Sequence, residues 1–179
     1  KPFTSARLNT LGKFEQTYGR YEFRAKMPQG TGLWPALWLL ASDYETNIWP
    51  ACGEIDIMEM RGQKPGELHG SLHGPSYSGG AAKTRSLQIE PSLAETFHRF
   101  SIIWSPQRIE WFVDDQLYHR VTKDEFSPQS PWVFDRPFFM IVNLAVGGNF
   151  VGPVPSSSSF PAHMLIDYVR VYTAVESAP

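Results

Sequence analysis

Three carboxyl groups within six residues are the feature of this sequence that could do chemistry. Glu54, Asp56 and Glu59 lie in the run Gly53-Glu-Ile-Asp-Ile-Met-Glu-Met-Arg-Gly62, whose other side chains are mostly apolar and typical of a strand. In a regular strand successive side chains alternate between faces, so Glu54 and Asp56 share one face and Glu59 points into the core. An unpaired carboxylate there would be costly. We therefore predict a β-bulge between Ile57 and Glu59, which returns Glu59 to the face of the other two acids.

Clustered acids of this kind can keep one carboxyl protonated beside an ionised one, because like charges separate their proton affinities. Cleavage of a glycosidic bond needs such a pair, one acting as nucleophile and one as acid. Two glutamates this near in one strand indicate the short separation, roughly 5–5.5 Å, of a retaining mechanism. Four effective strand steps span about 13 Å, so the side chains must lean together across a curved sheet. The alternative is that the three acids only form the solvated polar face of an ordinary strand. The mutual repulsion of clustered acids argues against it.

The segment Glu54-Ile-Asp-Ile-Met-Glu59 resembles the active-site signature of glycoside hydrolase family 16, in the form with the extra bulge residue that laminarinases carry. Further segments resemble the family in the family's order: Arg20–Pro28, Gly32–Trp38, Trp49–Glu54, Leu72–Pro75, Trp111–Asp114, Asn143–Gly148 and Asp167–Val171. The resemblance covers essentially the whole chain. It implies that Glu54 is the nucleophile, that Asp56 assists it by a hydrogen bond, and that Glu59 is the general acid and then the base. It implies no cofactor for catalysis.

The resemblance also points to residues that bind a sugar chain. Trp34, Trp38 and Trp49 match cleft tryptophans of the family, and the apolar face of a sugar ring stacks well on an indole. A place in the core is the alternative for each of them. Trp104 and Trp111 lie far along the sequence from the three active-site acids and are expected in the core.

Four further residues have a functional and a structural interpretation. His73 is expected on the strand beside the acids, where it could bond a carboxylate or a sugar hydroxyl, or serve only structure. Asn143 is a lone amide in an apolar strand, so it needs partners, either sugar hydroxyls or protein groups. Arg7 matches a cleft arginine of the family. Asp167 matches a residue that in many relatives binds a structural calcium ion, which takes several oxygen ligands.

Short strands separated by turn signals predict an all-β, antiparallel sandwich. The expected strands are 20–27, 33–40, 54–60, 68–73, 97–104, 108–113, 116–121, 138–146 and 164–172, with a further one reading through 3–8. No helical period extends beyond two turns. The resemblance refines the fold to a concanavalin A-like jelly roll whose concave sheet forms a sugar-binding cleft.

Length and composition fit this picture. The 179 residues suit one domain, 1–179, and the net charge of −2 favours no polyanion such as nucleic acid. The sequence shows no long apolar span, and its single cysteine, Cys52, excludes an intrachain disulfide. Family members have several strands before the position of Lys1, so we expect a domain shortened at its N-terminus. We expect a monomer without a membrane partner, secreted because its substrate is a polymer.

The function predicted is retaining endo-hydrolysis of β-1,3-glucan of the laminarin type, extending to mixed-linkage β-1,3-1,4-glucan. One alternative keeps the chemistry and changes the polymer to a galactan, as in agarases and carrageenases; the near-neutral charge argues mildly against sulfated sugars. A transglycosylase is disfavoured by the extra residue Met58. The other alternative is a non-catalytic glucan-binding protein on the same fold, which typically loses the glutamates that are retained here.

Overall fold

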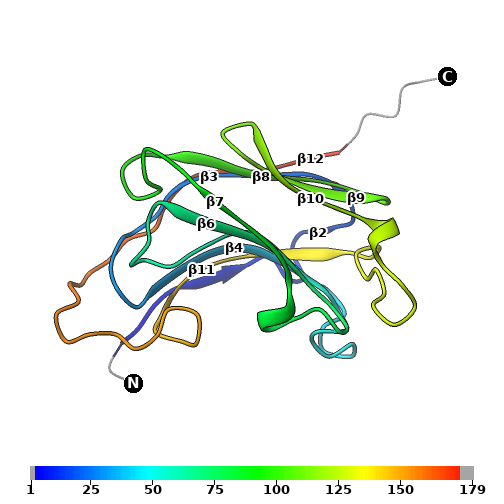
Figure 1. The fold of residues 1–179 in the computed structure, drawn as a ribbon, viewed down its shortest axis with the longest axis horizontal. Helices are drawn as coiled ribbons and strands as arrows, with labels where there is room; N and C mark the ends of the chain where they lie inside the picture. The colour runs from blue at the N-terminus through cyan, green and yellow to red at the C-terminus, as the bar shows by residue number, and fades with distance from the viewer. Residues whose placement is uncertain (1–2, 174–179) are drawn as a thin grey trace.

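Two antiparallel β-sheets stacked face to face form the protein, and the predicted all-β sandwich is confirmed (Figure 1). The computed structural model describes residues 3–173. The seven-stranded sheet has the order β1-β11-β4-β5-β6-β7, with β2 also paired to β11, and the five-stranded sheet has the order β10-β9-β8-β3-β12. The strands of the first sheet are β1 (Arg7–Asn9), β2 (Glu15–Gln16), β4 (Leu33–Ala41), β5 (Glu54–Met60), β6 (Glu67–His73), β7 (Lys83–Gln88) and β11 (Phe138–Val146). Those of the second are β3 (Gly19–Lys26), β8 (His98–Ser105), β9 (Arg108–Val113), β10 (Gln116–Thr122) and β12 (Leu165–Tyr172).

The core lies between the sheets and is built by alternation of side chains along the strands, which bulges interrupt in places. In β4, Leu37 and Leu39 point inward and are fully buried, whereas Trp34 and Trp38 point to the outer face. The large rings of the facing sheet fill the interior, among them Trp104 and Trp111, each at most 1% exposed. Their place in the core agrees with the sequence prediction. Burial of each large apolar side chain contributes about 1.5–3 kcal/mol to the stability of the fold. The pattern of apolar residues therefore determines which face of β4 and β5 packs on the core and which faces outward.

Three segments differ from the sequence prediction. Strand β7 was not predicted, because it is an edge strand whose side chains are mostly exposed and polar, so it has no apolar alternation. The strand β2 was too short to give a pattern. The strand expected over 3–8 is wrong in its bounds, since pairing begins only at Arg7 and runs to Asn9. Two 3₁₀ turns, η1 (Gly79–Ala81) and η2 (Lys123–Glu125), are the described helices, and neither is long and apolar enough to cross a membrane.

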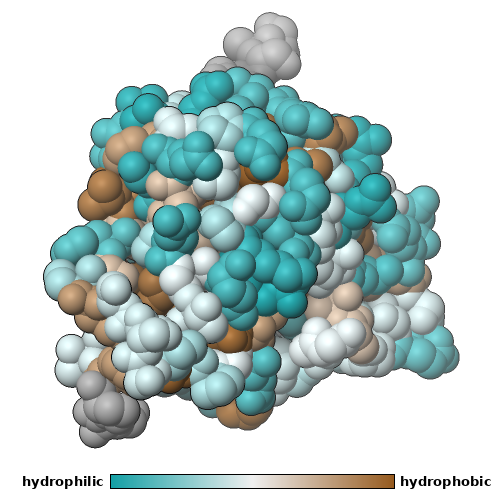
Figure 2. Space-filling view, turned by 60° about the vertical axis from the view of Figure 1, so that its left-hand side comes forward, coloured by the Kyte–Doolittle hydropathy of each residue, from teal (hydrophilic) through white to brown (hydrophobic). Residues whose placement is uncertain are grey.

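Hydrophobic side chains also reach the surface in separate groups among hydrophilic ones, as one face of the molecule shows (Figure 2). Strand β12 carries exposed apolar side chains. Its residues Leu165, Ile166, Val169 and Tyr172 are 36% to 47% exposed. Strand β12 is the edge of the five-stranded sheet, so within residues 3–173 this edge has no further strand beside it.

Candidate active site

The bulge predicted in β5 is present and returns Glu59 to the outer face of the sheet. Against β6, Asp56 pairs with Ser71 and Glu59 pairs with His69, so that Ile57 and Met58 stand opposite a single residue. Against β4 the register shifts at the same place. Five residue steps in β5 therefore match four in β6, and Glu54, Asp56 and Glu59 all lie on one face.

These three acids line a cleft of about 370 Å³ on the outer face of the seven-stranded sheet. Its lining comes from neighbouring strands and from the segment before β1: Ser5, Ala6, Arg7, Trp34, Ala36, Trp38, Glu54, Asp56, Glu59, Asn143, Leu144 and Ala145. The order β1-β11-β4-β5 places the arginine, the amide, the two indoles and the acids side by side across the sheet. Residues from four separate parts of the sequence thus share one concave surface.

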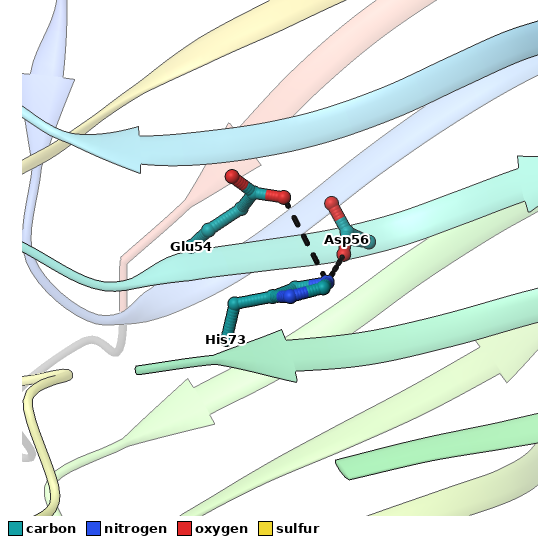
Figure 3. A group of neighbouring side chains, drawn as sticks. All are labelled: Glu54, Asp56 and His73. Atoms are coloured by element: carbon teal, nitrogen blue, oxygen red, sulfur yellow. Dashed lines mark ion pairs between the residues drawn. The ribbon is translucent and has the colours of Figure 1, made fainter. Parts of the chain in front are cut away.

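His73 completes the carboxylate cluster from β6 (Figure 3). Its Nε2 atom lies 2.9 Å from Asp56 Oδ2 and 3.8 Å from Glu54 Oε1. Its Nδ1 atom accepts the backbone N–H of Gly79 at 3.1 Å, so the neutral imidazole carries its proton on Nε2, facing the acids. Ligand atoms of the three residues lie within 4.8 Å of one another, close enough to hold a proton or a cation between them.

Burial makes all three carboxyl groups weak acids. Loss of water raises the pKa of Glu54 and of Asp56 well above their ordinary values, and neighbouring carboxylates raise both further. Burial also raises the pKa of Glu59, while a hydrogen bond from Trp34 works in the opposite direction. The indole Nε1–H of Trp34 donates to Glu59 Oε1 at 2.8 Å. These surroundings favour the protonated form of the carboxyl groups, as a general acid requires.

The second indole, Trp38, is held in the cleft by two contacts. Its Nε1–H donates to Asn143 Oδ1 at 2.7 Å, which leaves the amide NH₂ of Asn143 as a donor. The Arg7 guanidinium carbon lies 4.8 Å from the ring centroid of Trp38, a cation–π contact. Asn143 thus has the protein partner that its structural interpretation required, and its amide NH₂ can still donate a hydrogen bond to a sugar hydroxyl.

Besides His73, which borders the acids from β6, two of the candidate residues lie outside the cleft lining. Trp49 is 44% exposed, and its ring centroid lies 6.0 Å from that of His73, which places it at the rim beside the cluster. Asp167 lies on β12, in the other sheet, where its Oδ2 atom is 2.6 Å from Arg24 Nη1. Within residues 3–173, no group of three or more His, Cys, Asp or Glu side chains includes Asp167.

The structure adds cleft-face residues that the sequence analysis did not single out. His69 pairs in register with Glu59, and its Nδ1 atom lies 2.8 Å from Ser86 Oγ. Phe150 packs against both Trp34 and His69, with ring centroids 5.2 and 5.3 Å away. The spacing of two between His69, Ser71 and His73 could have identified this polar row. Phe150 had no such signal, because it lies in a loop.

An antiparallel sheet that carries three carboxyls beside part-exposed indoles in a cleft defines a carbohydrate-active β-sandwich. Residues 1–170 match the family described as Glycosyl hydrolases family 16, and the chain belongs to this family.

Individual relatives agree with that assignment. The chain is 43% identical to a beta-glucanase of Rhodothermus marinus, over 98% of this chain and 64% of that protein. Its structure is similar to the laminarinase catalytic domain from Thermotoga maritima, with a TM-score of 0.92 and 48% identity over 95% of this chain and 69% of the other. It is also similar to an endo-beta-1,3-glucanase from Pyrococcus furiosus, with a TM-score of 0.92 and 47% identity over 96% and 67%. The chain thus spans about two thirds of the length of these relatives.

Proposed function

We propose that the protein is a retaining endo-glycosidase that cleaves β-1,3-glucan of the laminarin type and extends to mixed-linkage β-1,3-1,4-glucan. The observation that carries this proposal is the bulge in β5, which brings Glu54, Asp56 and Glu59 to one face of a cleft lined by indoles. The choice of polymer is supported by the similarity to a beta-glucanase and to laminarinases reported above.

In the first step proposed, a Glu54 oxygen attacks the anomeric carbon while the bond to the leaving sugar oxygen breaks. Glu59, whose pKa is raised by burial, gives its proton to that oxygen, so the leaving sugar departs as an alcohol. Asp56, next to Glu54 and 2% exposed, shares a proton with Glu54 and holds it in place.

In the second step, Glu59 accepts a proton from water as the water oxygen attacks the glycosyl–Glu54 ester. The C–O bond to Glu54 breaks, the carboxylate is restored, and two inversions give overall retention. This chemistry needs only the two carboxyl groups and water. Trp34 and Trp38 provide faces on which the sugar rings stack, and Arg7, Asn143, His73 and Trp49 are proposed to contact hydroxyls or the polymer's outer sugars.

The experiment that tests this is reducing-sugar release from laminarin, barley β-glucan, agarose and carrageenan, by the wild type and by Glu54→Gln. We expect activity on laminarin, weaker activity on barley β-glucan, and loss of about 10³-fold or more in the variant, since the nucleophile is removed. ¹H NMR of the first anomer released from laminarin should show the β form. Release of the α form would contradict retention.

The rival functions predict different results in the same assay. Activity confined to agarose or carrageenan would keep the carboxylate chemistry and replace the substrate with a galactan. Binding to laminarin without hydrolysis, by a protein with a cooperative thermal transition, would favour a non-catalytic glucan-binding protein. Glu59→Ala gives a further check on an aryl β-glucoside, whose aryloxide leaves without needing a proton: sodium azide should then speed release from the glycosyl intermediate and give a β-glycosyl azide, because azide needs no general base.

Three further properties are proposed with the activity. The polymeric substrate supports action outside the cell, and the protein is proposed to act as a monomer. A structural calcium ion at Asp167 is proposed from the family resemblance, in competition with the Arg24 contact. Addition of calcium should then raise the Tm of the wild type and leave that of Asp167→Asn unchanged. Equal shifts in both proteins would place any calcium effect elsewhere.

A further inference from the structure

One buried side chain of the facing sheet reaches the catalytic strand. Trp111 lies on β9, has no exposed surface, and donates its indole Nε1–H to the backbone carbonyl oxygen of Asp56 at 2.8 Å. In a regular antiparallel ladder that oxygen would point within the sheet toward a neighbouring strand. Here it accepts a bond from the opposite sheet, across the core.

The acceptor sits where the ladder breaks. Asp56 is the last residue of β5 in register with β6 before the bulge, and Glu59 is the next. A bulge leaves its extra residue unpaired and locally disrupts the ladder, so a backbone group beside it needs another partner. The Trp111 indole supplies that partner between Glu54 and Glu59.

The strand opposite the bulge is shaped to admit the indole. Gly70 stands alone in β6 against Ile57 and Met58. A Cβ at this position would collide with Tyr118 Oη and would lie 2.7 Å from Trp111 Cδ1, closer than such atoms approach. His119 stacks on the Trp111 ring, with centroids 4.6 Å apart and planes 27° from parallel. The missing Cβ of Gly70 thus leaves room for the Cδ1–Nε1 edge of the indole, and the stacked imidazole of His119 holds its ring.

We infer that Trp111 is a positioning residue that holds the β5 bulge at Ile57 and Met58, and thereby sets Glu59 relative to Glu54. The inference goes beyond the proposed hydrolysis but rests on it for its kinetic consequence. A one-residue slip of a strand turns its side chains to the other face. Without the bond from Trp111 the bulge can migrate along β5, and the Glu59 carboxyl loses its fixed place in the cleft. Misplacement of a reacting group by about 1 Å can cost up to 10²-fold in rate.

The test is Trp111→Phe, which keeps an aromatic ring in the core and removes the N–H donor. Trp104→Phe is the matched control, because Trp104 is equally buried and its indole also donates to a backbone carbonyl, that of Phe134 at 3.1 Å, which belongs to no strand of the cleft. Both variants lose one indole bond and should lose similar thermal stability. We expect kcat on laminarin to fall about 10- to 100-fold only in Trp111→Phe, with KM within twofold of wild type. The basic limb of its kcat/KM–pH profile should move, whereas that of Trp104→Phe should not.

A second measurement does not depend on activity. Amide hydrogen exchange of Ile57, Met58 and Glu59 should become at least tenfold faster in Trp111→Phe, relative to the rest of β5, and should be unchanged in Trp104→Phe. If Trp111→Phe does not fold, 3-benzothienylalanine placed at position 111 keeps the ring shape and replaces only the N–H with sulfur. It should give the same exchange and rate changes.

The outcomes separate the two claims. A wild type that cleaves none of the glucans overturns the proposed function, while the exchange measurement still decides whether Trp111 holds the bulge. Equal kcat losses in both phenylalanine variants, or bulge amides that exchange as in the wild type, would reduce Trp111 to an ordinary core residue and overturn the inference.

Discussion

Trp34→Phe is the change that most directly tests how the cleft sets the pKa of its general acid, Glu59. In the wild type the indole donates to Glu59 Oε1 at 2.8 Å, and this bond lowers the pKa of Glu59 against the larger, raising effect of burial. Phenylalanine keeps an aromatic face for the sugar but has no donor. The ionised form of Glu59 therefore loses more support than the protonated form, so the pKa of Glu59 should rise.

The size of the effect follows from the strength of the lost bond. A hydrogen bond to a charged acceptor is worth about 1.5–3 kcal/mol, and a protonated carboxyl retains part of it. A remaining difference of about 1.4 kcal/mol between the two protonation states is a tenfold change in acid dissociation. We therefore expect Glu59 to become a roughly tenfold weaker acid in this variant. Because Glu59 acts in its protonated form in the first step, the enzyme should stay active to higher pH.

The assay is the pH dependence of kcat/KM on laminarin oligosaccharides, which reports the free enzyme. Trp38→Phe is the control, since its indole donates to Asn143 Oδ1 and not to a carboxylate. Both variants should raise KM, but only Trp34→Phe should displace the basic limb to higher pH. An unmoved limb, or one at lower pH, would refute the assignment of Glu59 as the acid tuned by Trp34.

Three other predictions follow from the same contacts. The raised pKa of Glu59 stabilises the fold at low pH, and this stability is lost as pH rises through the folded pKa. Glu59→Gln cannot ionise, so its Tm should exceed that of the wild type at neutral pH, and the difference should disappear toward about pH 4. An equal gain in Tm at both pH values would contradict this. Arg7→Met removes a cation–π contact worth about 0.5–1 kcal/mol from Trp38, so KM for laminarin should rise roughly two- to fivefold with kcat kept, and a fall in kcat alone would argue against a binding role. Gly70→Ala should destabilise the protein by about 1–3 kcal/mol in urea unfolding, because its Cβ meets Trp111 and Tyr118, whereas Gly80→Ala, with nothing within 4 Å, should stay within about 0.5 kcal/mol.

Much of the sandwich could be predicted because a strand with one buried face shows alternating apolar and polar residues in the sequence. In β4 the outward indoles alternate with inward leucines, and in β5 the violation of alternation at Glu59 was itself the evidence for a bulge. Regular alternation would bury the Glu59 carboxylate, which is costly, and a bulge avoids this by returning Glu59 to the face of the other acids. Strand β7 shows the opposite case: an exposed edge strand has no buried face to leave a pattern.

The partners of the cleft residues could not be predicted from local sequence. Asn143 and Trp38 lie 105 positions apart, and only the pairing of β11 with β4 brings the amide to the indole. The sequence left open whether Asn143 bonds protein or sugar, and the structure gives it a protein partner without exhausting its donors. Trp111 was assigned to the core correctly, yet its bond to the Asp56 carbonyl depends on the distance between sheets, which no strand pattern encodes.

The same register explains how a strand can carry both a nucleophile and an acid. Glu54 and Glu59 are separated by five residue steps on β5 but by four on β6, from His73 to His69, so each glutamate faces a histidine across the sheet. Their environments then differ: Glu54 lies beside Asp56 and His73, while Glu59 is bonded by Trp34. Asp56 can hold the proton that it shares with Glu54, and the nearby His73 favours the ionised form of Glu54, as a nucleophile requires. Burial raises the pKa of Glu59 by more than the Trp34 bond lowers it, as a general acid requires. The bulge is what gives the two glutamates different neighbours, and any change that shifts it should alter both roles at once.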